Sequence, residues 1–320
     1  MVTMKLAFVF PGQGSQSVGM MSGYATHPVV RETFAEASDA LGEDLWALVS
    51  SDRDGALDRT VNTQPVMLTA GVAVWRAWLA AGGPRPDIVA GHSLGEYTAL
   101  VAAGALAFRD AVPLVRFRAQ AMQDAVPAGV GAMAAIMGLD EAGIAAACAE
   151  AGAGEVVEAV NFNAPNQIVI AGNAGAVERA IAACKARGAK RGVLLPVSAP
   201  FHSSLMKPAA QRLAERLASV AFTAPAIPVL HNVDVALHRD APAIRDALAR
   251  QAASPVRWVE TISAFSARGV GRIAECGPGR VLTGLSKRIA PAVECLPLDD
   301  GDAIAAALAS VGSGHDGGTA

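Results

Sequence analysis

One serine stands between two glycines in the stretch "AGHSLGEY", which runs from Ala90 to Tyr97. In the pattern Gly-x-Ser-x-Gly the serine can be an exposed nucleophile on a strained turn between a strand and a helix, because its small neighbours let the backbones approach closely. The flanking segments fit, since the apolar run "DIVA" precedes the turn and the helical run "EYTALVAA" follows it. We predict that Ser93 is a nucleophile; the alternative is an ordinary structural turn.

A serine nucleophile needs an adjacent general base, and the chain has six histidines. His202 lies in the loop "SAPFHSS" and His231 ends the apolar run "IPVLHN", so both could reach the serine. We favour His202, because a base belongs on a loop beside a domain cleft. Either histidine could instead be structural. No acid stands in an obvious place to orient the base: Asp234 is the nearest candidate, and a carbonyl oxygen could do the same.

One arginine falls on the apolar side of a predicted helix. In "AVPLVRFRAQAMQDAV" the positions spaced three and four apart are Val115, Arg118, Ala119 and Met122. A buried guanidinium needs hydrogen-bond acceptors. Arg118 therefore forms an internal salt bridge, extends its charged end to solvent, or binds a carboxylate of the substrate through two parallel hydrogen bonds.

The turn "FPGQGSQ", residues 10–16, follows the first predicted strand. Two glycines around Gln13 allow a ligand to approach the backbone closely. The turn lacks the GK[ST] of a P-loop and the third glycine of a dinucleotide fingerprint. The backbone N–H of Gln13 could complete an oxyanion hole with that of Leu94, beside the N-terminus of the helix after the serine. A plain glycine turn is the alternative.

The elements that must position these residues follow from the alternation of apolar runs with Ala/Leu-rich helical stretches. Such alternation predicts an α/β fold with a parallel sheet and helices on both faces. Within it, residues 128–198 read as strand, helix, strand, strand, helix, strand, which is the ferredoxin-like order. We therefore expect a large domain of residues 1–127 and 199–308, a ferredoxin-like insert at 128–198, and a disordered Gly-rich tail at 309–320.

Composition excludes several other classes of protein. With 52% apolar and 17% charged residues, the 320-residue chain can bury a sizeable core. A net charge of −3 without a basic run makes nucleic acid an unexpected partner, and no apolar run approaches the ~20 residues of a membrane span. The N-terminal apolar run is too short for a signal peptide, and the four cysteines show no CxxC spacing. We expect a cytoplasmic protein without a metal site.

Many short blocks carry a resemblance to one family: "FVFPGQGSQ", "TQPVMLTAG", "GHSLGEYTAL", "GAMAAIMGL", "NFNAPNQIVIAG", "PVSAPFHSSLM", "ASPVRW" and "ECGPGRVLTGLSKRI". In this order they resemble the malonyl-CoA:acyl-carrier-protein transacylases of fatty-acid synthesis, over about residues 4–308. The resemblance implies a hydrolase-like α/β core with the ferredoxin-like insert. It implies that Ser93 is acylated, that His202 is the base, and that Arg118 grips the malonyl carboxylate.

Other site residues are implied by the same resemblance. The backbone N–H groups of Gln13 and Leu94 would form the oxyanion hole, and the main-chain carbonyl of Gln251 would orient the histidine. Asn161 matches a position near the active-site cleft. The sequence Ala199-Pro200 before Phe201-His202 is similar to malonyl-selective relatives, so Phe201 is a candidate substrate contact. The chain departs from the family at Ala119 and Asn166, where glycine is common; neither position touches the proposed chemistry.

The implied reaction is a ping-pong transfer of malonyl from malonyl-CoA to acyl carrier protein, without a cofactor and by a monomer. Lys190, Arg191, Lys287 and Arg288 are candidates for receiving an acidic carrier, although each could be a solvated surface residue. Three alternatives stay open. The first is a thioesterase or esterase, whose neutral substrate would leave a buried Arg118 unpaired. The second is an acyltransferase of malonate decarboxylase or of a polyketide synthase, which differs only in its acceptor. The third is a non-enzymatic carrier-binding scaffold, which would not need Ser93.

Overall fold

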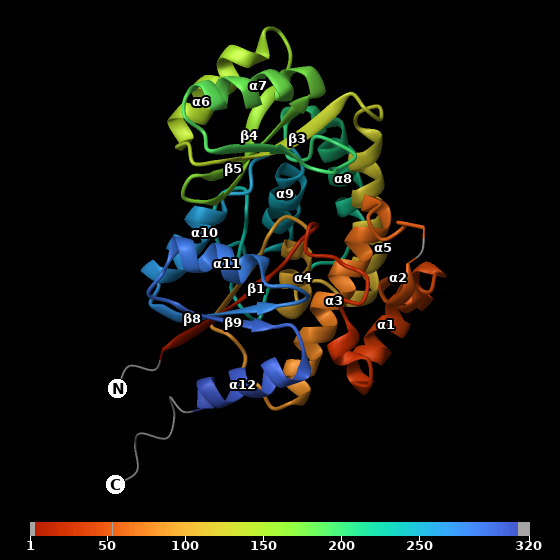
Figure 1. The fold of residues 1–320 in the computed structure, drawn as a ribbon. Helices are drawn as coiled ribbons and strands as arrows, with labels where there is room; N and C mark the ends of the chain where they lie inside the picture. The colour runs from red at the N-terminus through yellow and green to blue at the C-terminus, as the bar shows by residue number, and fades with distance from the viewer. Residues whose placement is uncertain (1–3, 53, 313–320) are drawn as a thin grey trace.

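A five-stranded sheet forms the centre of the larger part of the protein in the computed structural model, which describes residues 4–52 and 54–312 (Figure 1). All four strand pairings in it are parallel. In spatial order the strands are β7 (Val229–Leu230), β2 (Ile88–Gly91), β1 (Lys5–Phe10), β8 (Val270–Cys276) and β9 (Glu294–Leu298). The predicted parallel sheet is therefore confirmed.

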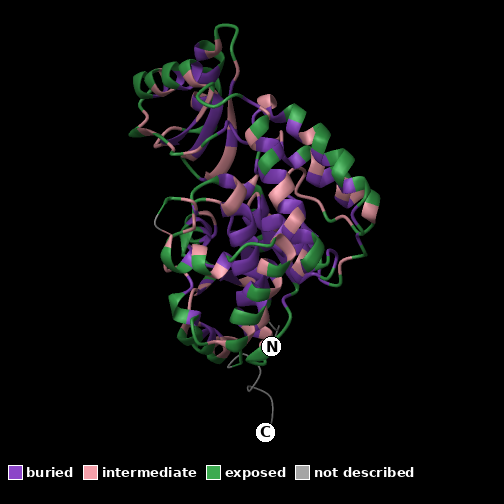
Figure 2. Cartoon of the chain, turned by 90° about the vertical axis from the view of Figure 1, so that its right-hand side faces the viewer, coloured by how far each residue is buried: buried purple, intermediate pink, exposed green. Residues whose placement is uncertain are grey.

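Alternating side chains of β1 point to two separate cores. Leu6, Phe8 and Phe10 pack into the larger cluster, whereas Ala7 and Val9 pack into a smaller cluster on the opposite face. This period of two is what a strand covered on both faces requires. Figure 2 shows the buried residues gathered in the centre of the larger part and the exposed residues on the outer sides of the helices.

Helices cover both faces of the parallel sheet. The larger cluster includes residues of α1 (Pro28–Leu41), α2 (Leu45–Ser51), α3 (Thr60–Ala80), α4 (Gly95–Ala102), α5 (Phe108–Asp124), α8 (Lys207–Ala218), α9 (Ala241–Gln251) and α12 (Gly301–Gly312). The smaller cluster includes residues of α10 (Trp258–Ala267) and α11 (Val281–Ile289). Two short 3-10 helices, η1 (Ser22–Tyr24) and η2 (Ser204–Met206), complete this part of the described chain.

A second, four-stranded sheet has only antiparallel pairings and lies at the top of Figure 1. Its spatial order is β4 (Val157–Ala164), β5 (Gln167–Asn173), β3 (Gly131–Met137) and β6 (Arg191–Leu194). Helices α6 (Glu141–Gly152) and α7 (Ala174–Ala186) cover one face. The chain order and the pairing are those of a ferredoxin-like unit, as predicted.

The uncovered face of this small sheet packs against the larger part of the protein. Met133 and Val169 share a cluster of buried residues with Phe201 and Met206, which follow the insert, and with Met122 of α5. A carboxylate adds a polar contact: Glu158 of β4 accepts hydrogen bonds from the N–H and the hydroxyl of Ser204, at 2.7 and 2.8 Å. The small sheet therefore meets the larger part of the protein at residues 199–206, the segment that contains the candidate site residues Phe201 and His202.

Three elements differ from what the sequence predicts. The apolar run at 190–197 predicts a strand to 197, but β6 ends at Leu194, because Pro196 has no N–H for the sheet. The helical run at 203–219 predicts one helix, but the structure has η2 and α8, and Pro208 stands in the first turn of α8, where proline is tolerated. The disorder expected from 309 is wrong for residues 309–312: Ile304 and Ala307 are buried and hold α12 in place, and the helix continues to Gly312. Residues 313–320 lie outside the described residues.

Candidate active site

Ser93 lies on the turn from β2 into α4, at the carboxyl edge of the parallel sheet. Its φ is +51°, a left-handed conformation that non-glycine residues adopt uncommonly and that is often found at active sites. The flanking glycines are required sterically. A Cβ added to Gly91 would lie 1.8 Å from the carbonyl carbon of Gly95, and a Cβ on Gly95 would lie 2.0 Å from the carbonyl oxygen of Phe10. The turn is therefore a strained elbow that presents the serine hydroxyl.

His202 is the histidine that contacts the serine. Its Nε2 lies 2.7 Å from Ser93 Oγ, and its Nδ1 lies 2.9 Å from the carbonyl oxygen of Gln251. The carbonyl can only accept, so Nδ1 carries the proton and Nε2 is free to take the serine proton. Burial, and secondly the positive charge of Arg118, lower the pKa of His202 to about 3. The imidazole is therefore neutral at physiological pH, the state that a general base needs.

His231, the alternative base, does not contact Ser93, and Asp234, the candidate acid, does not contact His202. His231 is fully buried and its Nδ1 lies 2.7 Å from Oε1 of Glu96, so it contacts the other side of the elbow. Asp234 accepts hydrogen bonds from His238 and Arg250, at 3.0 and 2.9 Å, and does not orient the base. The group that contacts His202 Nδ1 is instead the main-chain carbonyl of Gln251, the last residue of α9.

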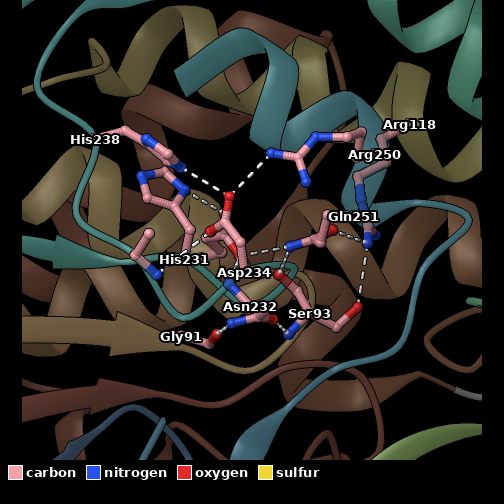
Figure 3. A network of polar contacts seen from close by, with 11 residues as sticks. Gly91, Ser93, Arg118, His231, Asn232, Asp234, His238, Arg250 and Gln251 are labelled. Carbon is pink, nitrogen blue, oxygen red and sulfur yellow. Dashed lines mark hydrogen bonds and ion pairs between the residues drawn. The ribbon is translucent and has the colours of Figure 1, made fainter. Parts of the chain in front are cut away.

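The guanidinium of Arg118 lies beside the serine, as Figure 3 shows. The residue is only 2% exposed, so it does not extend its charge to solvent. One terminal nitrogen donates to Gln64 Oε1 at 2.7 Å, and the other donates to Ser93 Oγ at 3.1 Å and Gln251 Oε1 at 2.9 Å. Within the described part of the chain all its hydrogen bonds go to neutral oxygens, which excludes the internal salt bridge. A buried cation next to a nucleophile is suited to an anionic substrate group.

A cavity of about 100 Å³ opens at the serine. A cavity needs only about 10–15 Å³ of such space to hold one water molecule, so this one has room for an acyl group of a few heavy atoms. The cavity is lined by Gln13, Gln64, His92, Ser93, Leu94, Arg118, Met122, Met133, Asn161, Leu195, Val197, Phe201 and His202. All the candidate site residues except Gln251 are in this lining, and Gln251 lies behind it in contact with Arg118 and His202.

The loop "FPGQGSQ" packs directly on the elbow. A Cβ on Gly12 would lie 2.5 Å from the carbonyl oxygen of His92 and 3.6 Å from the nitrogen of Leu94. The side chain of Gln13 is held by the hydroxyl of Thr60, which donates to its Oε1 at 2.8 Å. Among the residues that the structure describes, the N–H groups of Gln13 and Leu94 donate to no other group. This arrangement suits an oxyanion hole.

Sequence reasoning missed the polar residues that support the elbow. The N–H of Ser93 donates to Oδ1 of Asn232 at 2.8 Å, and Gln64 is one of the acceptors of Arg118. Glu96 is fully buried in the same region. Its signal was present, because a single carboxylate interrupts the apolar run after the serine.

Residues 4–52 and 54–312 contain neither a candidate metal cluster nor a membrane-spanning helix. No group of three or more His, Cys, Asp or Glu side chains is placed to hold a metal ion. No described helix is long and apolar enough to cross a membrane. The four cysteines are buried free thiols, and none lines the cavity at the serine.

Comparison with known sequences identifies relatives over nearly the whole chain. The acyl transferase domain family matches residues 7–288. A malonyl CoA-acyl carrier protein transacylase of Salmonella typhimurium is 56% identical over 305 residues, which cover 95% of this chain and 99% of the relative. The protein of the same name from Bacillus subtilis is 42% identical over 314 residues, covering 98% and 99%.

Solved structures give the same result. The crystal structure of an acyl-carrier-protein S-malonyltransferase from Burkholderia pseudomallei superposes with a TM-score of 0.94 at 60% identity, covering 96% of this chain and 100% of the other. A malonyl-transacylase solved in complex with a type II PKS acyl-carrier protein has a TM-score of 0.94 at 52% identity, covering 96% and 99%. On these matches, the chain belongs to the malonyl-CoA:acyl-carrier-protein transacylase family of acyl transferases.

Proposed function

We propose that this chain transfers the malonyl group of malonyl-CoA to the phosphopantetheine thiol of an acyl carrier protein, through a malonyl ester of Ser93. The observation that supports this proposal most is the pair of contacts made by the hydroxyl oxygen of Ser93. Ser93 Oγ lies 2.7 Å from a neutral imidazole nitrogen of His202 and 3.1 Å from a buried guanidinium nitrogen of Arg118. The imidazole serves the nucleophile, and the cation serves a substrate that carries a carboxylate.

In the first half of the reaction, Ser93 Oγ attacks the thioester carbon while its proton moves to Nε2 of His202. The carbonyl oxygen becomes an oxyanion, which the N–H groups of Gln13 and Leu94 stabilise. The C–S bond then breaks, and the leaving CoA sulfur takes the proton from His202. The products are malonyl-Ser93 and free CoA.

Arg118 selects and positions the acyl group. The malonyl carboxylate would take over guanidinium hydrogen bonds that now go to neutral oxygens, at 2.7 to 3.1 Å. A carboxylate is a stronger acceptor for guanidinium than an amide oxygen, and two parallel bonds fix its orientation. Asn161 and Phe201, which line the cavity, are the further candidates for contacts with the acyl group.

In the second half, the carrier thiol attacks the ester carbon and gives its proton to His202. The tetrahedral intermediate collapses, Ser93 leaves as the alcohol after taking that proton back, and malonyl-carrier is released. These steps use only the chain's own residues and the two substrates. We propose that one copy of the chain is sufficient, because one chain supplies every residue of the site, and that it works in the cytoplasm.

The carrier would bind at exposed basic residues and pass its phosphopantetheine arm to the cavity. Lys190, Arg191, Lys287 and Arg288 are all exposed, and within the described residues none of them forms an ion pair. Their charges are therefore available to an acidic partner. We propose residues 128–198 as a small domain that supplies one wall of the cleft, through Met133 and Asn161.

The test is the intact mass of the protein after brief incubation with malonyl-CoA and, separately, with acetyl-CoA. We expect a malonyl adduct on the wild-type protein and none on Ser93→Ala. Subsequent addition of holo acyl carrier protein should remove the adduct and appear as malonyl-carrier. Release of free CoA without an adduct would indicate a hydrolase, and the absence of both adduct and CoA would exclude the proposed transfer.

A further inference from the structure

Four polar residues lie fully buried behind the Ser93 elbow: Glu96, His231, Asn232 and Gln251. They come from three segments, namely helix α4, the loop after β7, and the last turn of α9. Buried polar groups cost stability unless they are hydrogen-bonded, so their partners show what the cluster holds.

The carboxylate of Glu96 connects the three segments. Its Oε1 accepts from Nδ1 of His231 at 2.7 Å, and its Oε2 accepts from the N–H of Asn232 and from Nε2 of Gln251, both at 3.0 Å. Glu96 is the second residue of α4, where the helix dipole favours a negative charge. One carboxylate thus fixes the β7 loop and α9 to the helix that follows the serine.

Asn232 and Gln251 then hold the backbone of the elbow itself, as Figure 3 shows. Asn232 accepts from the N–H of Ser93 at 2.8 Å and donates to the carbonyl of Gly91 at 2.7 Å. Gln251 donates to the carbonyl of Ser93 at 2.9 Å. Both peptide groups of a residue with φ of +51° are therefore held, and a strained conformation persists only where its surroundings fix it in this way.

Gln251 extends the same network to the other reacting groups. Its main-chain carbonyl accepts from His202 Nδ1 at 2.9 Å, and its side-chain oxygen accepts from Arg118 at 2.9 Å. The network from Glu96 therefore sets the position of the nucleophile, the base and the cation relative to one another.

We propose that Glu96 and Asn232 are positioning residues for acyl transfer, acting through the elbow backbone and Gln251. The side chain of Asn232 is the more direct of the two, because both of its hydrogen bonds go to elbow backbone. This inference rests on the proposed function. It differs from a purely structural role, in which loss of the network would lower stability but leave the turnover of the folded protein unchanged.

The variants are Asn232→Leu, which keeps the approximate shape and removes both bonds, and Glu96→Gln, which keeps the size. In Glu96→Gln the new amide NH₂ can take one of two places. At the place of Oε2 it would face two other donors, the N–H of Asn232 and Nε2 of Gln251, and at the place of Oε1 it would face Nδ1 of His231. His231 could then accept only by moving its proton to Nε2, a buried atom without a partner among the described residues. Both variants should lower kcat for malonyl transfer by about 10- to 100-fold, with KM for malonyl-CoA changed less than about threefold.

Thr261→Val is the matched control. Thr261 is fully buried in α10, and its hydroxyl donates only to the carbonyl of Arg257, the N-cap residue of that helix. It should lose stability comparably while its kcat stays within threefold of wild type. Thermal unfolding and circular dichroism of each variant establish that the measured protein is folded.

A second readout separates this inference from the proposed function. The rate at which a fluorophosphonate probe labels Ser93 reports the nucleophile without malonyl-CoA or carrier. Labelling should slow in both variants in proportion to kcat. If the wild-type protein labels but forms no malonyl adduct, the proposed function fails while the positioning test continues with the probe alone.

The positioning role is overturned if a folded variant keeps kcat and labelling rate within threefold of wild type, or if only KM rises. If Asn232→Leu does not fold, the decision passes to Asn232→Asp. That variant keeps the size and the acceptor for Ser93 N–H, but places an oxygen against the Gly91 carbonyl, and the same criteria apply to it.

Discussion

As the general base that we propose, His202 would set the pH range in which acyl transfer can occur. His202 is held neutral by burial and by the nearby charge of Arg118, which together lower its pKa to about 3. The acid limb of kcat/KM should therefore lie well below the ordinary histidine pKa of about 6.5. In Arg118→Gln the charge is absent, so the limb should move upward. A pH–rate profile of both proteins checks this, and an inflection near 6.5 in the wild type would contradict it.

We propose that Arg118 decides between malonyl and acetyl groups. Arg118→Ala removes the cation that we propose for the malonyl carboxylate, and hydrogen bonds to charged groups contribute about 1.5–3 kcal/mol each. The kcat/KM for malonyl loading should fall roughly 10²- to 10³-fold, while acetyl loading rises relative to it. Arg116→Ala is the matched control, because this neighbouring arginine pairs with Glu43 at 2.6 Å at the surface. Equal losses for both acyl groups would argue against selection by charge.

At this scale the sequence predicts residue types better than it predicts partners. The glycines around Ser93 and the place of Arg118 on an apolar stripe could be found from spacing alone. The acceptors of Arg118 could not, because Gln64 and Gln251 are 54 and 133 positions away and only tertiary packing brings them together. Asn232 was missed for the same reason, being 139 positions from Ser93.

The loop after β1 is the element whose fit to the elbow is tightest. In Gly12→Ala the new Cβ would lie 2.5 Å from the backbone oxygen of His92, so the loop must move away and take the N–H of Gln13 with it. Losing one oxyanion donor should lower kcat by about 10²- to 10³-fold. Steady-state kinetics and thermal unfolding measure the two effects.

Gly284→Ala serves as the control for that loop variant. Gly284 lies within α11, where an added Cβ meets nothing within 4 Å. Alanine is the better helix former by roughly 0.8–1.0 kcal/mol, so stability should rise and activity should stay unchanged. A Gly12→Ala protein with wild-type kcat would show that the Gln13 amide is not needed.

Element order was predictable, but element ends and packing faces were less so. The alternation of strand and helix signals predicted the parallel sheet and the ferredoxin-like unit. Asp140 directly before a helical run predicts an N-cap, and in the structure it caps α6, accepting from the N–H of Gly143 at 2.8 Å. Periodicity gives no information on which face of the small sheet meets the larger part. The choice of face depends on the packing of Met133 and Val169 against the cluster that contains Phe201, which brings together distant segments of the chain.

For the whole molecule, the buried histidines make stability depend on pH. Burial lowers the pKa of both His92 and His202. In acid, these two histidines are therefore protonated in the unfolded chain while they are still neutral in the folded chain. Stability rises with pH wherever the unfolded state binds more protons, so the free energy of unfolding should fall as pH drops from about 6.5 toward 3.

His202→Asn isolates the contribution of one histidine, and asparagine tolerates the left-handed backbone at this position, where φ is +66°. Its unfolding free energy should fall less steeply with acid, by up to about one proton in the slope. Urea unfolding at pH 7.5 and pH 5 measures the difference. Equal slopes for the two proteins would mean that His202 titrates normally in the folded state.

Carrier binding is also a property of the whole surface. Lys190→Glu and Lys287→Glu should each raise KM for the carrier by about fivefold and leave malonyl loading from CoA unchanged, because a rim charge acts mainly on encounter. The effect should shrink at high salt. Arg239→Glu, at another exposed position, is the control for net charge. An equal rise of the carrier KM in this variant would show that the effect comes from net charge and not from a docking site at Lys190 or Lys287.

The cavity at the serine is built by both sheets, and this division has an evolutionary consequence. Ser93 and Arg118 belong to the larger part, whereas Met133, Asn161 and Leu195 belong to or adjoin the small sheet. Substitutions in the small sheet can therefore reshape the space for the acyl group while the nucleophile, base and cation stay in register. Descendants of such a protein can exchange one building block for another and inherit the chemistry intact.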